Sequence, residues 1–172
     1  MTMETDLYAL IQPLVGGTVI WMDQNAPRPA LPYCAMKIMS RRRVNKDHYS
    51  DVGDSGVQTV TGDREFTLSI QRYQAYGADS VTGKLQEVAD KLQLTSVIDK
   101  FSAKGLVAFD AGQVQDISAL LDKTQIEKRA SLDISIRYQS VQNDTVGVIE
   151  TANIEGRDNG VNNPVYTIVA SV

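Results

Sequence analysis

The stretch that decides the fold is Leu132-Asp133-Ile134-Ser135-Ile136-Arg137-Tyr138, in which apolar and polar residues alternate without interruption. Because successive side chains of a β-strand point to opposite faces, this pattern predicts a strand with one buried face. Phe66 to Ile70 alternate in the same way, and together with residues 58–60 across the turn Thr61-Gly62-Asp63 they predict a β-hairpin. The chain is therefore expected to build a sheet that is buried on one side.

Helical and extended patterns surround these strands. Apolar residues at helical spacing predict a helix over Glu4 to Val15 and another that begins at Asp79 or Ser80 and includes Leu92. A turn-rich piece carries Val97, Ile98 and Phe101. Further strands are expected over residues 18–22, 33–44, 106–109 and 114–121, and 106–109 has the content of a fully buried strand. Residues 45–56 read as a loop in which Tyr49 anchors a short irregular strand.

The expected fold class is α+β, a mostly antiparallel sheet with two or three helices packed on one face, plus an extended hairpin or arm near the C-terminus. The 172 residues suit a single domain over residues 1–172, in which residues 140–163 form an extended excursion rich in turn signals. Residues 165–172 are expected to return as a terminal strand, which pairs within the domain or adds to a neighbour's sheet edge.

The amino-acid composition argues against nucleic-acid binding, secretion and membrane association. A formal charge of −4 provides no electrostatic footprint for binding a nucleic-acid backbone. Cys34, the single cysteine, cannot form an internal disulfide, and the N-terminus lacks the pattern of a secretory signal, so folding in a reducing cytoplasm is expected. No apolar run approaches the roughly 20 residues that cross a bilayer, and membrane association is not expected.

Residues suited to chemistry are sparse. His48 is the single histidine and lies between Asp47 and Tyr49, with no nucleophile elbow elsewhere in the chain. A lone cysteine and a lone histidine offer no zinc-ligand spacing, and the glycines match no nucleotide-binding pattern. No catalytic residue, cofactor or metal site is therefore predicted. The one basic cluster, Arg41-Arg42-Arg43, is a weak candidate for phosphate contact, and a solvated strand end is the favoured interpretation.

The most informative stretch runs from Trp21 to Tyr33, with the order Gln24-Asn25-Ala26-Pro27-Arg28-Pro29-Ala30-Leu31-Pro32-Tyr33 between two expected strands. Three X-Pro bonds make it stiff and extended, which lowers the entropy lost on docking to a partner. The other interpretation is that the prolines only route the chain between the strands. As a contact surface, its candidate interface residues are Trp21, Gln24, Asn25, Pro27, Arg28, Pro29, Pro32 and Tyr33.

This stretch resembles the signature of the tail terminator proteins of the bacteriophage neck, and the resemblance is clearest from Asp6 to about Phe109. It implies a non-enzymatic structural virion protein that forms a ring, a hexamer in that family, which ends tail-tube polymerisation and joins the tail to the head connector. The implied partners are copies of itself, the tail tube protein, a head completion or connector protein and, if the tail is contractile, the sheath protein. DNA would pass through the lumen without specific binding. The implied location is the virion neck, after assembly in the host cytoplasm.

Three alternatives stay open. The chain could be another head–tail joining or tail-completion protein, which its binding partner would reveal. It could be a small ligand-binding or hydrolase domain that uses His48 with Asp47 or Asp51. It could also be a nucleic-acid-binding module built on residues 41–43, which predicts binding that weakens steeply with salt.

Overall fold

The structure is a computed structural model, and it describes residues 2–52, 55–77, 79–122, 125–147, 152–153 and 167–168. Its helices within these residues are α1 (Met3–Val15), α2 (Val81–Lys91) and α3 (Thr95–Ser102). Its strands there are β1 (Thr18–Trp21), β2 (Tyr33–Arg43), β3 (His48–Tyr49), β4 (Val57–Gln74), β5 (Leu106–Ala111), β6 (Gln115–Asp116), β7 (Ala119–Asp122), β8 (Gln125–Thr145), β9 (Ala152–Asn153) and β10 (Thr167–Ile168).

The chain divides into two compact units. The first comprises Met1–Asn45 and Asp63–Gln139, and the second comprises Lys46–Gly62 and Ser140–Val172. Strands β4 and β8 begin in one unit and end in the other. That the whole chain unfolds as a single domain stays a prediction.

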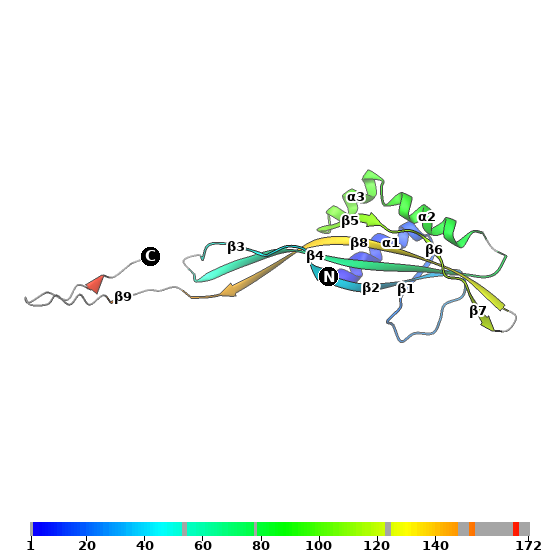
Figure 1. The fold of residues 1–172 in the computed structure, drawn as a ribbon, viewed down its shortest axis with the longest axis horizontal. Helices are drawn as coiled ribbons and strands as arrows, with labels where there is room; N and C mark the ends of the chain where they lie inside the picture. Colours follow the sequence, from blue (N-terminus) through cyan, green and yellow to red (C-terminus); the bar gives the residue numbers. More distant parts are fainter. Residues whose placement is uncertain are drawn as a thin grey trace, which may run out of the picture. The chain divides into compact units, whose positions relative to one another are not determined.

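The main sheet has the strand order β1-β2-β4-β8-β5, and within the described residues β3 also pairs with β4 while β6 and β7 pair with β8. Strands β1 and β2 are parallel, whereas β2 with β4 and β5 with β8 are antiparallel. In the first unit the three described helices lie on one face of this sheet (Figure 1). The prediction of an α+β fold with a mostly antiparallel sheet and helices on one face is confirmed.

One hydrophobic cluster fills the space between the helices and the sheet. Its members alternate along the strands and recur at helical spacing along the helices, as one-sided burial requires. They include Leu7 and Ile11 of α1, Leu85 and Val88 of α2, Phe101 of α3, Cys34 and Met36 of β2, Phe66, Leu68 and Ile70 of β4, and Leu132, Ile134 and Ile136 of β8. The alternating run of residues 132–138 thus forms one wall of the core.

Side chains close to the helices in sequence cap the starts of α1 and α2, and a glycine ends α1. The side chain of Thr2 accepts a hydrogen bond from Thr5 N at 3.4 Å, and the side chain of Ser80 accepts one from Gly83 N at 3.1 Å. Both contacts satisfy amides that a helix N-terminus leaves without a partner. Gly16 ends α1 with a φ of 63°, a conformation that glycine adopts without steric cost. Ser80 confirms the predicted start of α2 and Gly16 the predicted stop of α1, whereas α1 begins at Met3, one residue before the expected Glu4.

The expected hairpin at Thr61-Gly62-Asp63 is wrong. Residues 57–74 form one continuous strand, β4, which passes through the three supposed turn residues. Its neighbours explain why: Asp63 O accepts a hydrogen bond from Val44 N at 3.1 Å, and Thr61 pairs with His48. Ladder partners on a neighbouring segment override the local turn preference of a Gly-Asp pair. The pairing of His48 and Tyr49 confirms the short strand expected around Tyr49.

Two other strands differ from expectation. Residues 106–109 were predicted to be fully buried, but β5 lies at the sheet edge, and Val107 and Phe109 are 52% and 42% exposed. Residues 114–121 form two short strands, β6 and β7, because Ser118 turns the chain by accepting and donating hydrogen bonds with the backbone of Arg129. Strand β8 runs from Gln125 to Thr145, well beyond the seven alternating residues.

In the second unit, β3 and the beginning of β4 pair in antiparallel orientation, and Thr59 Oγ1 lies 3.2 Å from Asn143 Oδ1 of β8. Gly56 O accepts hydrogen bonds from Val146 N and Gly147 N at 3.0 and 3.2 Å. A Cβ on Gly56 would lie 3.0 Å from Gly147 Cα, so this crossing requires glycine. Of the predicted excursion over residues 140–163, residues 140–145 continue β8, 152–153 form β9, and 148–151 and 154–163 lie outside the described residues.

Candidate interface segment

The proline-containing segment, residues 24–32, connects the parallel strands β1 and β2. Met22 N donates to Met36 O at 2.9 Å, and Gln24 N donates to Trp21 O at 3.3 Å, which turns the chain away from the sheet. The segment itself is neither helix nor strand, and the peptide bond between Leu31 and Pro32 is cis. Prolines lack an amide donor, which suits a connection that pairs with no strand. We call residues 24–32 the interface segment.

Arg28 holds the middle of the interface segment against the sheet. Its guanidinium forms an ion pair with Glu127 of β8, whose side chain is fully buried, while the Arg28 side chain is 44% exposed. The second oxygen of Glu127 accepts a hydrogen bond from Arg129 Nε at 2.6 Å. Taking a carboxylate out of water is costly unless cations and hydrogen bonds compensate it, and here an arginine contacts each oxygen.

Two stacked tyrosines complete this anchor. Tyr33 and Tyr73 are register partners on β2 and β4, and their rings lie 4.7 Å apart at an interplanar angle of 7°. The Arg28 guanidinium carbon lies 5.6 and 5.5 Å from the two ring centroids, and that of Arg129 lies 5.3 Å from the Tyr73 ring. Cations over aromatic faces are attracted by the ring quadrupole. We call Arg28, Tyr33, Tyr73, Glu127 and Arg129 the clamp.

The clamp lies on the sheet face opposite the helices. Cys34 and Met36 belong to the core beneath the helices, so the alternation of β2 directs Tyr33 to the other face. Burial of Tyr73 raises the pKa of its phenol, and Tyr33 adds to that effect, so the Tyr73 ring stays neutral around pH 7. The segment is thereby fixed in place by side chains from three strands.

The structure places the eight sequence-derived candidates in three different settings. Tyr33 is 4% exposed and belongs to the interior, and Arg28 is engaged within its own chain. Trp21 and Pro29 are half-buried. The candidates that remain exposed are Gln24, Asn25, Pro27 and Pro32. The exposed part of the segment before Arg28 is residues 24–27, which we call the tip, and Arg28 and Tyr33 hold the segment against the sheet.

Sequence reasoning missed the other half of the clamp. Tyr73, Glu127 and Arg129 were not singled out, although Tyr73 falls in the stretch compared with the phage family. The run Ile126-Glu127-Lys128-Arg129-Ala130 precedes the predicted strand, but its three consecutive charged residues do not alternate with apolar ones and give no strand signal. Nothing in that run indicates that Glu127 is buried, because its cationic partner lies 99 positions earlier in the chain.

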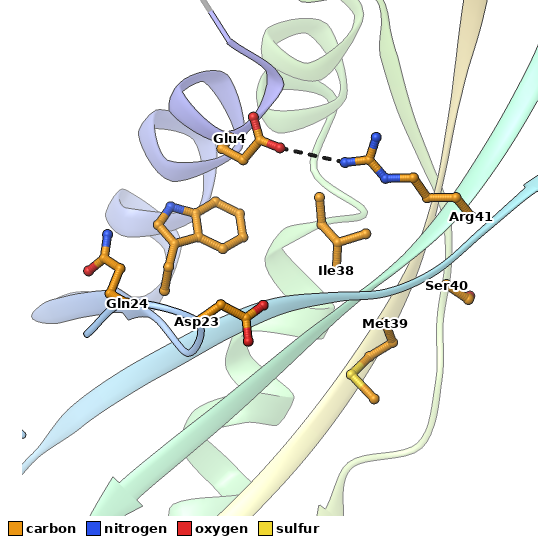
Figure 2. Close-up of a pocket in the computed structure, with 8 residues that line it drawn as sticks. Glu4, Asp23, Gln24, Ile38, Met39, Ser40 and Arg41 are labelled. Atoms are coloured by element: carbon orange, nitrogen blue, oxygen red, sulfur yellow. Dashed lines mark ion pairs between the residues drawn. The ribbon is translucent and has the colours of Figure 1, made fainter. Parts of the chain in front are cut away.

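Two adjoining hollows lie beside the interface segment. The first has a volume of about 520 Å³. Its lining residues are Glu4 of α1, Trp21 of β1, Asp23 and Gln24 just after β1, and Ile38, Met39, Ser40 and Arg41 of β2. Figure 2 shows Glu4 and Arg41 facing each other across it, and their ion-pair atoms lie 3.5 Å apart. Met39 lies on the other side of β2 from Ile38 (Figure 2) and is 59% exposed.

The second hollow runs along β1. It holds about 390 Å³ and is lined by Glu4, Thr5 and Tyr8 of α1, by Val19, Ile20 and Trp21 of β1, and by Gln24. We call it the edge groove. It shares the lining residues Glu4, Trp21 and Gln24 with the first hollow, so the two adjoin at these side chains.

The basic cluster is largely paired with acids. Arg41 contacts Glu4, and Arg42 donates to Glu65 Oε1 at 2.6 Å, while Arg137 Nε contacts the other oxygen of Glu65 at 3.2 Å. The hydrogen bond from Arg42 lowers the pKa of Glu65 below its ordinary value of 4.5. Phosphate contact by residues 41–43 stays a prediction, and it would have to compete with these carboxylates.

The remaining candidates for chemistry lie apart. His48 is exposed on β3. Cys34 is buried, and burial raises the pKa of its thiol, an effect that Arg72 partly offsets from 3.9 Å. Within the described residues, no three His, Cys, Asp or Glu side chains are grouped so as to hold a metal ion. None of the helices in that part of the chain is long and apolar enough to span a bilayer.

In a comparison with known proteins, the family described as phage neck terminator protein matches residues 5–160 of the chain. Because this match covers most of the chain, the protein belongs to the phage neck terminator family. It is a structural protein of the bacteriophage neck, as the resemblance of residues 21–33 predicted. No curated protein sequence matches the chain.

Proposed function

We propose that this protein forms a homo-oligomeric ring, a hexamer, that stops tail-tube polymerisation and joins the tail to the head connector. The observation that carries the proposal is the family match over residues 5–160, which includes the whole core, the interface segment and the clamp. A subunit that uses two different surfaces for its two neighbours yields a ring when the rotation closes. The partners proposed with it are the tail tube protein, a head completion or connector protein and, in a contractile tail, the sheath protein.

The tip of the interface segment, residues 24–27, is the contact surface we propose. It is exposed, it carries two amide side chains for hydrogen bonds, and the clamp holds its backbone before any partner arrives. Fixing a loop in advance removes part of the ordering entropy that binding otherwise costs. The clamp residues then act as positioning residues, and the tip residues make the contacts.

We further propose that the protein acts without catalysis and without gripping DNA. The exposed setting of His48 and the neutral, buried thiol of Cys34 support the first part. The acidic chain, with Arg41 and Arg42 paired to carboxylates, supports free passage of DNA through a lumen. Assembly in the host cytoplasm belongs to the same proposal.

Electron microscopy of the purified protein, alone and mixed with tail tubes, tests the proposal. Closed rings and tubes capped at one end are the expected result. The double change Gln24→Ala with Asn25→Ala should reduce capping while leaving the thermal unfolding curve unchanged. Gln113→Ala, which truncates an equally exposed amide elsewhere, is the matched control. Rings that decorate the head portal and ignore tube ends would favour a head–tail joining role and contradict tail termination.

A further inference from the structure

Strand β1 is a sheet edge without the usual protection. In the described part of the chain it pairs with β2 alone, in a register without a shift, and its sequence Thr18-Val19-Ile20-Trp21 has no charge and no proline. Edge strands normally carry a charge, a proline or a bulge that prevents pairing with another chain. The opposite edge, β5, has both a register shift between Ala108 and Asp110 and the charge of Asp110 itself. Of the two edges, β1 is the one suited to accept a further strand.

Space for that strand lies along β1. The edge groove borders Val19, Ile20 and Trp21, and its other wall is the Glu4–Tyr8 side of α1. The backbone N–H and C=O groups that β1 directs away from β2 form the edge available to an incoming strand. Addition of an extended segment to such an edge obtains its affinity from main-chain hydrogen bonds and its specificity from alternate side chains.

The chain itself contains a segment with matching chemistry. Residues 165–172, Val-Tyr-Thr-Ile-Val-Ala-Ser-Val, carry no charged side chain and are rich in β-branched residues. Within them, Thr167–Ile168 form β10, which pairs in antiparallel orientation with β9 in a two-stranded sheet, so one of its two edges is already occupied; the other six residues lie outside the described part of the chain. Eight extended residues span about 26 Å, whereas the four residues of β1 need only about 13 Å. An uncharged, strand-forming segment at the chain end fits an uncharged edge.

We propose that residues 165–172 of a second copy add as a strand to the free edge of β1 and occupy the edge groove. The inference rests on the proposed ring, because it names the contact that joins one subunit to the next. Each subunit then has one donor segment and one acceptor edge, and such head-to-tail contacts close into a ring.

Two full-length variants test this contact from opposite sides. Thr18→Lys places a charge on the acceptor edge at an exposed position, and Ile168→Pro removes an amide donor and a strand-compatible backbone from the donor segment. Each variant alone should sediment as a monomer at concentrations at which the wild type forms rings. Val107→Lys is the matched control for the first, because it adds the same charge to an exposed position of the other edge strand, β5. Thr167→Val, which keeps strand propensity, is the control for the second.

Mixing the two variants separates contact between copies from contact within one copy. The Thr18→Lys chain keeps its donor segment and the Ile168→Pro chain keeps its acceptor edge, so an equimolar mixture should form a heterodimer and no larger species. Trp21, the single tryptophan, lines the edge groove and supplies a second measurement. With Trp21→Phe placed in the Thr18→Lys chain, the remaining tryptophan should shift its emission to shorter wavelength as the groove is covered.

Rings formed by Ile168→Pro at wild-type concentration would overturn the inference and leave the ring proposal standing. A mixture that stays monomeric would overturn it as well. If the wild type never forms rings but the mixture still yields a heterodimer, the strand contact is supported and the ring proposal fails. The wild type could instead be a monomer in which the Ile168→Pro change shifts the Trp21 emission to longer wavelength. In that case the segment covers the β1 edge of its own chain, which contradicts a contact between copies.

Discussion

Removing Arg28 should destabilise the folded subunit by about 2 kcal/mol. Loss of one partner of a buried ion pair costs about 3–5 kcal/mol when the remaining charge is uncompensated. Two features reduce this cost in free energy of unfolding to about 1–2 kcal/mol. Arg129 still contacts one oxygen of Glu127, and Arg28 is 44% exposed, so solvent screens its ion pair. Loss of the cation–π contacts with the two stacked tyrosines adds about 0.5–1 kcal/mol.

Urea and thermal unfolding of Arg28→Ala measure this change. For a chain of this size, about 2 kcal/mol corresponds to a fall in Tm of about 4–8 °C. Arg28→Lys should recover part of the loss, because an ammonium keeps the charge but lacks the planar fork. Lys84→Ala, which removes an exposed ion pair with Glu87 on α2, is the control and should leave the unfolding curve unchanged.

A double-mutant cycle decides whether the ion pair itself is responsible. Arg28→Ala and Glu127→Gln should together cost less than the sum of their separate effects, with a coupling energy of about 1 kcal/mol or more. Coupling within about 0.3 kcal/mol of zero would refute the clamp, because independent sites add to within that range. Assembly that fails while Tm is unchanged would also refute it, and would show that Arg28 contacts a partner directly.

Four further outcomes follow, three at buried groups and one at the exposed His48. The Arg42 hydrogen bond lowers the pKa of Glu65, so the stabilisation is present at neutral pH and is lost as pH falls below 4.5; Glu65→Gln should therefore flatten the acid branch of an unfolding-against-pH curve. Cys34 should resist a thiol reagent at pH 8 in the folded protein and react at once in denaturant, and rapid labelling of the native state would contradict its burial. Leu132→Ala should cost about 2–5 kcal/mol in chemical denaturation, whereas His48→Ala should change neither stability nor assembly.

Local patterns predicted most of the secondary structure because the signals there are short-range. The caps at Thr2 and Ser80 and the alternation of residues 132–138 act within a few residues, and those elements formed as predicted. The errors arose where a neighbouring strand decides. Thr61-Gly62-Asp63 has turn composition, yet a hydrogen bond from Val44 N to Asp63 O and the pairing of Thr61 with His48 keep β4 continuous through it. Val107 and Phe109 have strand composition, and only their place at the edge leaves them exposed.

The sequence by itself determined the α+β class, the end of α1 at Gly16, the start of α2 and the lack of charge on β1, and the order of residues 21–33 predicted the phage neck terminator family. It did not predict α3, whose residues were expected only as a turn-rich piece. Only the tertiary structure decided which side chains of that stretch face outward. Tyr33 turns inward, and Arg28 folds back onto the sheet while staying 44% exposed, because their partners, Tyr73 and Glu127, arrive on strands from distant parts of the chain. Local preferences reach only a few residues along the chain, whereas the burial of a carboxylate depends on every strand that meets around it.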